Sequence, residues 1–118
     1  MNSEIVINWF KKDICQKYIF IKLGNGEEKI VSLSDHPSIT PNHWEIGDEY
    51  ASTHEMALVH VPQTELEFSI LGGGKLEFYY ESRKLRVYDS SEQFGREPRE
   101  RTIRILQESF PDYEIDSS

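Results

Sequence analysis

Apolar and polar residues alternate along several stretches of the chain, and this pattern predicts β-strands. The first is a hairpin, KYIFIKLGNGEEKIVSL at 17–33, in which GNGEE supplies the turn between two apolar strands. Alternation with a period of two recurs at 64–70, 76–81 and 84–88, so each of these strands turns one face to a core and the other to water. The pattern therefore predicts a sheet built from one hairpin and several further strands.

Three consecutive glycines at 72–74 separate two of these predicted strands. Because glycine accepts backbone angles and close approaches that a side chain forbids, the triplet predicts a tight bend or a bulge. Strand 84–88 then leads into the small polar residues Asp89, Ser90 and Ser91. Hydroxyls and backbone N–H groups at a strand end can hold an anion, but a solvated hairpin end has the same composition, so both interpretations stay open.

Two starts compete for a helix in the segment that holds all four histidines. Thr40 as N-cap followed by Pro41 at the first helical position is a good start. Ser52 with Glu55 three residues later has the spacing of a capping box. Pro62 would end either helix.

A second helix is predicted between Pro98 and Pro111, because Ile103, Leu106 and Phe110 fall at helical spacing. The arginines of this segment are expected on its solvated face, near glutamates at short helical spacings: Arg99, Arg101 and Arg104 with Glu97, Glu100 and Glu108.

The order of these elements predicts the fold class. A hairpin, a helix, several strands, a helix and a short extended tail at 112–115 are typical of an α+β domain with a mixed, mostly antiparallel sheet and two main helices. With 118 residues, the chain is expected to form a single domain over 1–118.

Composition restricts the classes of molecule that the protein is expected to bind. The formal net charge of −8 argues against nucleic acid and against anionic membrane surfaces, since both need a positive protein surface. An anionic ligand would have to be captured by a local positive site. The single cysteine, Cys15, excludes an internal disulfide, and no secretory or membrane-spanning stretch is evident, so a cytoplasmic location is expected.

Three motifs resemble the janus/ocnus family, the small phosphohistidine phosphatases: LGGGKL at 71–76, RKLRVYDSSEQFG at 83–95 and FPDYEI at 110–115. The first strand, QKYIFIKL at 16–23, also resembles the family's first strand and puts Lys17 on the family's substrate-binding lysine. The similarity thus covers the first strand and the C-terminal half of the chain.

The resemblance implies an enzyme without metal or other cofactor that removes phosphate from histidine, in a phosphorylated protein or a small phosphoramidate, with one histidine as general base or phosphate acceptor. It implies that Lys17 and the loop around Ser91 bind the phosphate, with Glu92 and Gln93 supplying backbone N–H groups. Such a site is physically coherent, since phosphoryl transfer needs mainly positioning and charge stabilisation. A metal is not expected, because the histidine spacings match none of the close His pairs of zinc sites.

Two histidines compete for the catalytic role, because the resemblance implies a histidine that opens a helix before an acidic residue and an isoleucine. His43 in HWEI fits the helix start at Thr40, and His54 in STHEMAL fits the start at Ser52. His43 is favoured for its spacing.

Two acidic residues support a different class of function. Asp89 and Glu92 put negative charge in or beside the loop that would hold phosphate, where each would oppose binding. The alternative hypothesis is a non-catalytic janus-fold module that binds an anionic ligand or a protein partner.

Overall fold

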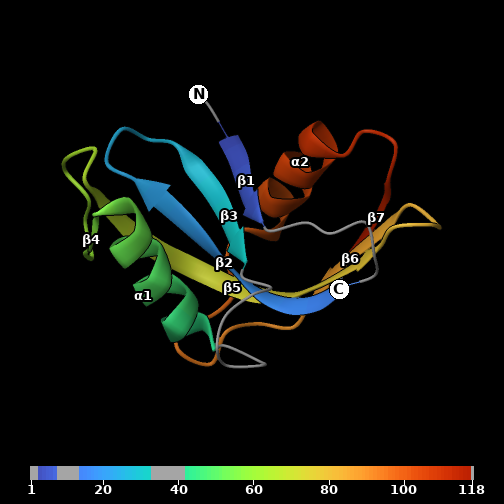
Figure 1. Ribbon diagram of the computed structural model, residues 1–118, viewed down its shortest axis with the longest axis horizontal. Coiled ribbons are helices and arrows are strands. Elements are labelled where there is room, and N and C mark those ends of the chain that lie inside the picture. Colours follow the sequence, from blue (N-terminus) through green and yellow to red (C-terminus); the bar gives the residue numbers. More distant parts are fainter. Residues whose placement is uncertain (1–2, 8–13, 33–41, 118) are drawn as a thin grey trace.

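The alternating segments of the sequence form one mixed sheet that carries two helices (Figure 1). The computed structural model describes residues 3–7, 14–32 and 42–117. Its strands are β1 (Ser3–Ile7), β2 (Ile14–Leu23), β3 (Glu28–Ser32), β4 (Ala57–Leu58), β5 (Glu67–Tyr79), β6 (Lys84–Tyr88) and β7 (Glu114–Ser117), and its helices are α1 (His43–His54) and α2 (Arg99–Ser109). The predicted α+β class is confirmed.

The sheet has the strand order β1-β3-β2-β5-β6-β7, and β4 pairs with β5 beside this path. The central pairings β3–β2, β2–β5 and β5–β6 are antiparallel, whereas β1–β3, β4–β5 and β6–β7 are parallel. The predicted hairpin is β2 and β3, and the mixed, mostly antiparallel sheet is confirmed. Neither helix of the described residues is long and apolar enough to cross a membrane.

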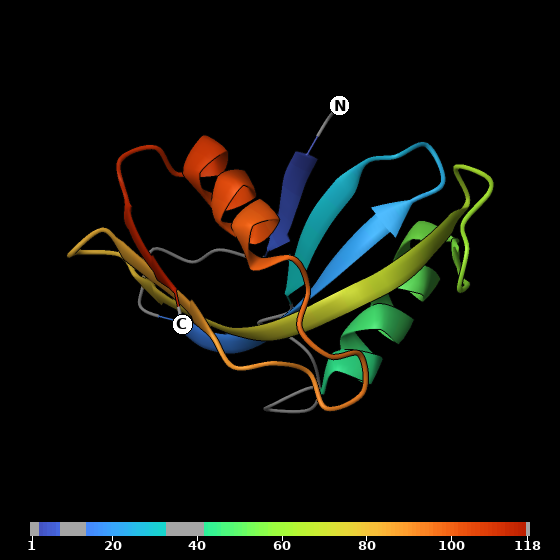
Figure 2. The same ribbon diagram turned by 180° about the vertical axis from the view of Figure 1, so that it is seen from behind.

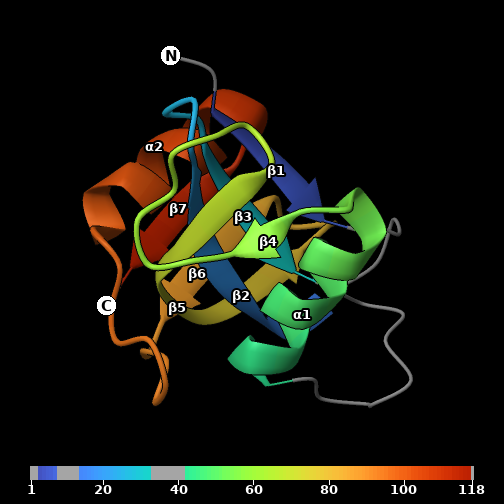
Figure 3. The ribbon, with the colours of Figure 1, turned by 90° about the vertical axis from the view of Figure 1, so that its left-hand side faces the viewer.

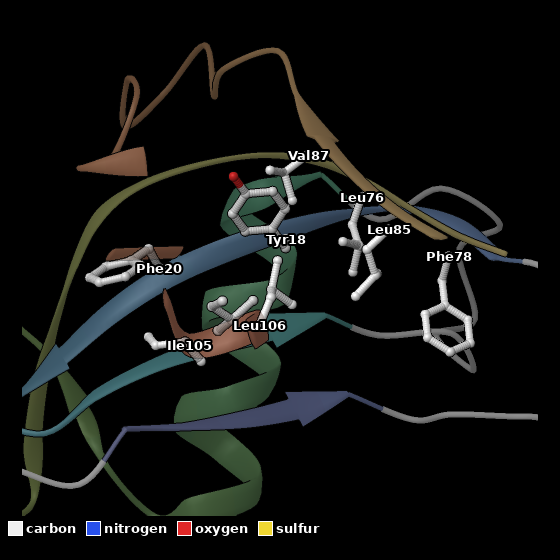
Figure 4. Packing of buried hydrophobic residues seen from close by; sticks show 9 residues of the cluster. Tyr18, Phe20, Leu76, Phe78, Leu85, Val87, Ile105 and Leu106 are labelled. Atoms are coloured by element: carbon white, nitrogen blue, oxygen red, sulfur yellow. The ribbon is translucent and has the colours of Figure 1, made fainter. Parts of the chain in front are cut away.

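The two helices cover opposite faces of the sheet (Figures 2 and 3). Side chains alternate across β2, so Tyr18 and Phe20 belong to the core under α2, whereas Ile19 and Ile21 belong to the core under α1. Figure 4 shows Tyr18 and Phe20 with their neighbours from β5, β6 and α2. Each helix therefore buries its apolar side against a different face of the same sheet.

The glycine triplet lies inside one long strand rather than between two. The predicted strands 64–70 and 76–81 join as β5, which corrects the expected break. The pairing with β2 shifts by one residue, because Phe20 faces Gly72 while Ile21 faces Ile70, and Leu71 is the extra residue. The prediction of a bulge is confirmed.

The first helix begins at His43, after Asn42 as N-cap. The Asn42 side chain accepts from the Glu45 N–H, and the Glu45 carboxylate accepts from the Asn42 N–H, which completes a capping box. The predicted cap at 40–41 lies outside the described residues, and the helix starts later than that cap would give. The rival start at Ser52 is wrong, because Ser52 lies inside α1.

The second helix confirms the prediction at 98–111, with one correction. Arg99, expected on the solvated face, is only 5% exposed and lies beneath the loop that follows β6. Arg101 does lie at the surface, where its Nη1 is 2.7 Å from the Glu28 carboxylate.

Candidate functional site

A polar cleft of about 280 Å³ lies where β2, β5, the start of α1 and the loop after β6 meet. Its lining side chains come from all four segments: Lys17, Asn42, His43, Lys75, Asp89, Ser90, Glu92 and Gln93. The chain brings these segments together because the antiparallel β2–β5 pairing sets Lys17 opposite Lys75, and β6 ends beside them. Figures 1 and 2 show the first turn of α1 next to the loop that follows β6.

His43 is held at the wall of this cleft by a hydrogen bond to the sheet. Its Nε2 lies 3.0 Å from the Gly74 carbonyl oxygen, and the residue is only 5% exposed. A carbonyl can only accept, so Nε2 carries the proton and Nδ1 of the neutral ring carries the lone pair. Burial lowers the pKa of His43 below its usual value, as does the Lys17 charge, although the Gly74 carbonyl and Asp89 oppose the shift. The ring is therefore neutral at pH 7 and is a proton acceptor.

Gly73 gives this ring its place. A β-carbon on Gly73 would lie 2.8 Å from His43 Cδ2 and 2.4 Å from the Tyr18 carbonyl oxygen. Both distances are shorter than the contacts that β-carbons make in proteins. The edge of the ring that carries Cδ2 and Nε2 thus faces β5 directly. Nδ1 lies on the opposite edge, away from the strand.

Ser91 organises the loop after β6 rather than lining the cleft. The residue is 3% exposed, and its Oγ accepts from the N–H groups of Gln93 at 3.2 Å and Phe94 at 3.1 Å. Its own N–H donates to the Gly73 carbonyl at 3.1 Å, which ties the loop to β5. Ser90, Glu92 and Gln93 are thereby set along the cleft wall.

The Glu92 N–H, in the part of the loop that lines the cleft, is open to a ligand. The Ser90 N–H donates to its neighbour's carboxylate at Asp89, and the Gln93 N–H donates to Ser91. The Glu92 N–H has no acceptor among the described residues. An anion in the cleft could use this donor.

The two lysines of the cleft differ in their partners. Lys75 Nζ lies 3.3 Å from the Asp89 carboxylate, which neutralises the lysine. The hydrogen bond from the Ser90 N–H, together with this lysine, lowers the pKa of Asp89. Within the described part of the chain, Lys17 has no carboxylate partner. Lys17 is therefore the cation that is open to an anionic ligand.

A buried polar cluster supports the loop from the α2 face. The Arg99 guanidinium donates to the Asp89 carbonyl at 2.6 Å and to the Glu97 carboxylate at 3.2 Å. Tyr18 Oη and Thr102 Oγ1 each donate to the same carboxylate at 2.5 Å. Sequence reasoning missed this cluster, since a solvated Glu–Arg pair has the same spacing. The only available signal was the glycine triplet, because a β-carbon on Gly74 would meet both Arg99 and Tyr18 at 3.1 Å.

His54 lies away from the cleft. It ends α1, where its Nδ1 is 3.1 Å from the Tyr50 carbonyl and its ring stacks on Tyr50 at 4.1 Å. The structure therefore brings together Lys17, His43, Glu92 and Gln93, with Ser91 behind them, and leaves His54 apart. Among the described residues, no group of three or more His, Cys, Asp or Glu side chains could hold a metal ion.

Comparison with known proteins identifies the family of this chain. The chain is similar to the Sex-regulated protein janus-A of Drosophila yakuba, with 43% identity over 47 residues, which are 40% of this chain and 35% of that protein. The protein of the same name in Drosophila pseudoobscura pseudoobscura is 30% identical over 102 residues, 86% of this chain and 67% of the relative. The first of these relatives is thus matched over about a third of its length. The model of the Janus/Ocnus family (Ocnus) matches residues 10–114, and the chain belongs to this family.

Proposed function

We propose that this protein is a phosphohistidine phosphatase, which hydrolyses the P–N bond of a phosphorylated protein or of a small phosphoramidate. The observation that carries the proposal is His43, a neutral imidazole with its Nε2 edge fixed against β5 and its Nδ1 edge free to act as a base. It borders a polar cleft of a size suited to a phosphoryl group and its leaving group.

The proposed reaction uses water as the nucleophile. His43 Nδ1 takes a proton from the water as its oxygen forms a bond to phosphorus, and the P–N bond breaks. The electron pair of that bond and a proton from solvent go to the leaving nitrogen, so the products are inorganic phosphate and the free imidazole or amine. The protein contributes positioning and charge stabilisation, which are the main needs of phosphoryl transfer.

Lys17 and the loop N–H groups would hold the phosphoryl oxygens. Lys17 is the cleft cation left open once Lys75 is paired with Asp89, and the Glu92 N–H is an open donor of the loop beside the cleft. The Glu92 carboxylate is exposed, so solvent screens its repulsion of the phosphate. Together these groups favour a dianion in a protein whose net charge is −8.

The test is hydrolysis of a phosphohistidine peptide, followed as release of inorganic phosphate. His43→Ala is expected to lower kcat/KM by about 100-fold or more, the usual effect of losing a general base. Lys17→Met should raise KM more than it lowers kcat. His54→Ala is the matched control, because His54 lies on the same helix outside the cleft, and it should retain wild-type rates.

The same experiment distinguishes the non-catalytic alternative. Wild-type protein that binds phosphate, with NMR shifts at Glu92 and Gln93, but releases none from the peptide would be a binding module. Full activity in His43→Ala would overturn the assignment of the base.

A further inference from the structure

A second hollow, of about 350 Å³, lies beside the polar cleft and differs from it in the chemistry of its lining. Its walls are mainly apolar: Trp44 from α1, Leu58 from β4, Val59 after it, Ile70 and Leu71 from β5, and Phe94 from the loop after β6. We refer to it as the apolar pocket.

The apolar pocket and the polar cleft share a wall. Trp44 follows His43 in α1, and Phe94 follows Gln93 in the loop, so each wall residue has a cleft residue as its neighbour in sequence. The rings of Trp44 and Phe94 stack with their centroids 6.5 Å apart. Trp44 is nevertheless 50% exposed, so a molecule held in the cleft can lie across this wall and reach the pocket.

The backbone at the floor of the pocket favours a polypeptide as the occupant. On this side of β5, β4 pairs only with Glu67 and Phe68, and β6 pairs from Lys75 onward. In the described part of the chain, no strand pairs with the segment 69–71 on that side, although this segment lines the pocket. An extended peptide can use such an open edge for main-chain hydrogen bonds and place a side chain in the pocket.

Charge restricts which peptide fits. Asp89 and Glu92 line the cleft, Glu92 is exposed, and the whole chain has a net charge of −8. Acidic residues close to the phosphohistidine would therefore be repelled, whereas a neutral apolar side chain gains by leaving water.

We propose that the apolar pocket receives a large apolar side chain from the polypeptide that carries the phosphohistidine, so that the substrate is a protein segment with such a residue beside the phosphorylated one. This inference rests on the proposed function, because it takes the phosphoryl group to lie in the cleft. It makes Trp44 and Phe94 residues that determine specificity.

Two peptides test the proposal. Each carries a non-hydrolysable phosphohistidine analogue, flanked on both sides by leucine in one peptide and by glycine in the other. The leucine peptide is expected to bind about tenfold more tightly, and its NMR titration should shift the Trp44 indole N–H and the Ile70 methyl groups. Equal affinity of the two peptides would overturn the proposal.

Matched variants locate the effect. Val59→Asp puts a charge in the pocket and should abolish the preference for leucine, whereas Val61→Asp changes a residue two positions away that is 72% exposed and outside the pocket, and should keep it. Both variants should retain the shifts that inorganic phosphate causes at Glu92 and Gln93. If Val59→Asp does not fold, Trp44→Ala takes its place, because its side chain is half exposed.

Other outcomes are separable. A wild-type dimer that Val59→Asp converts to a monomer would assign the pocket to a second copy and overturn the proposal. Hydrolysis of phosphohistidine peptides with no dependence on the flanking residue would also overturn it and leave the phosphatase intact. A leucine preference in binding without any hydrolysis would contradict the proposed function alone.

Discussion

Each glycine of the triplet at 72–74 makes room for a different neighbour. A β-carbon on Gly72 would lie 2.3 Å from the Glu97 backbone nitrogen, one on Gly73 would strike the His43 ring, and one on Gly74 would lie 2.6 Å from the Tyr88 carbonyl. Alternation along β5 sends these approaches to both faces of the sheet. The triplet therefore adjoins the cleft on one face of the sheet and the polar cluster on the other.

Gly73→Ala is expected to destabilise the protein by about 2 kcal/mol or more, because the new methyl group meets the backbone oxygen of Tyr18, which cannot move aside locally. Gly47→Ala in α1 is the control. Its methyl group would lie 2.7 Å from the end of the flexible Ile70 side chain, and alanine favours a helix over glycine by about 1 kcal/mol. Urea unfolding measures both, and equal losses would contradict the prediction.

The pKa of His43 should respond in opposite directions to the loss of the Lys17 charge and the loss of the Asp89 charge. Since the Lys17 charge lowers the pKa of His43 and the Asp89 charge raises it, Lys17→Met should raise this pKa and Asp89→Asn should lower it further. NMR titration of the imidazole Cε1–H gives the values.

Activity should follow the same titration. In the proposed reaction the neutral ring is the base, so the rate is expected to fall as the pH drops through the His43 pKa, which lies below 6.5. Moving this limb upward with Lys17→Met and downward with Asp89→Asn would support the assignment. A limb that ignores both variants would assign it to another group.

At the scale of elements, the sequence predicted the hairpin, β6, α2 and two strands that the structure joins as β5, because period and turn chemistry are local signals. It offered starts for α1 at Thr40 and Ser52 and missed the one at Asn42, since residue type alone makes all three suitable caps. The contact between His43 and the Gly74 carbonyl, 31 residues away in sequence, is present only in the folded chain. The sequence analysis also missed β1, because its parallel pairing with β3 leaves no turn signal in the sequence.

Asn42→Ala should destabilise the protein by about 1 kcal/mol, because the Glu45 N–H loses its acceptor at 2.8 Å. Ser52→Ala is the matched control, since Ser52 is exposed inside α1, where alanine is the better helix former. Chemical denaturation compares the two variants. A larger loss for Ser52→Ala would contradict the observed helix start.

Asn42→Ala should also affect the cleft. The cap fixes the first turn of α1, which carries His43, so a frayed first turn would loosen the His43 contact with Gly74. Phosphate-induced shifts at Glu92 should weaken in this variant and persist in Ser52→Ala.

At the scale of the whole molecule, the sheet separates the face that carries the polar cleft from the face that carries the buried polar cluster. The cleft lies at the start of α1, while the cluster of Tyr18, Glu97, Arg99 and Thr102 joins β2 to the start of α2. The two communicate through the loop after β6, because Arg99 holds the Asp89 carbonyl and the Asp89 carboxylate holds Lys75. Sequence reasoning could not find this link, since it requires three segments distant in sequence to meet.

Glu97→Gln should destabilise the protein by about 3–5 kcal/mol, because it leaves the Arg99 guanidinium buried without its carboxylate. The double variant Glu97→Gln with Arg99→Met should lose less than the sum of the two single variants, since each single variant already removes the interaction between the two residues and the sum counts it twice. Urea unfolding of the four proteins in this cycle gives the coupling energy, and strict additivity would show that the pair does not act as a unit.

The double variant also separates stability from function. Without the Arg99 guanidinium the Asp89 carbonyl loses a donor at 2.6 Å, so the loop should be less fixed even in molecules that remain folded. We expect the affinity for phosphate, measured from NMR shifts at Glu92 and Gln93, to weaken at least about fivefold. The His43 pKa should stay below its usual value, because the ring is still buried against Gly73. Unchanged phosphate affinity in the folded double variant would mean that Ser91 and its bond to Gly73 hold the loop without help from the far face of the sheet.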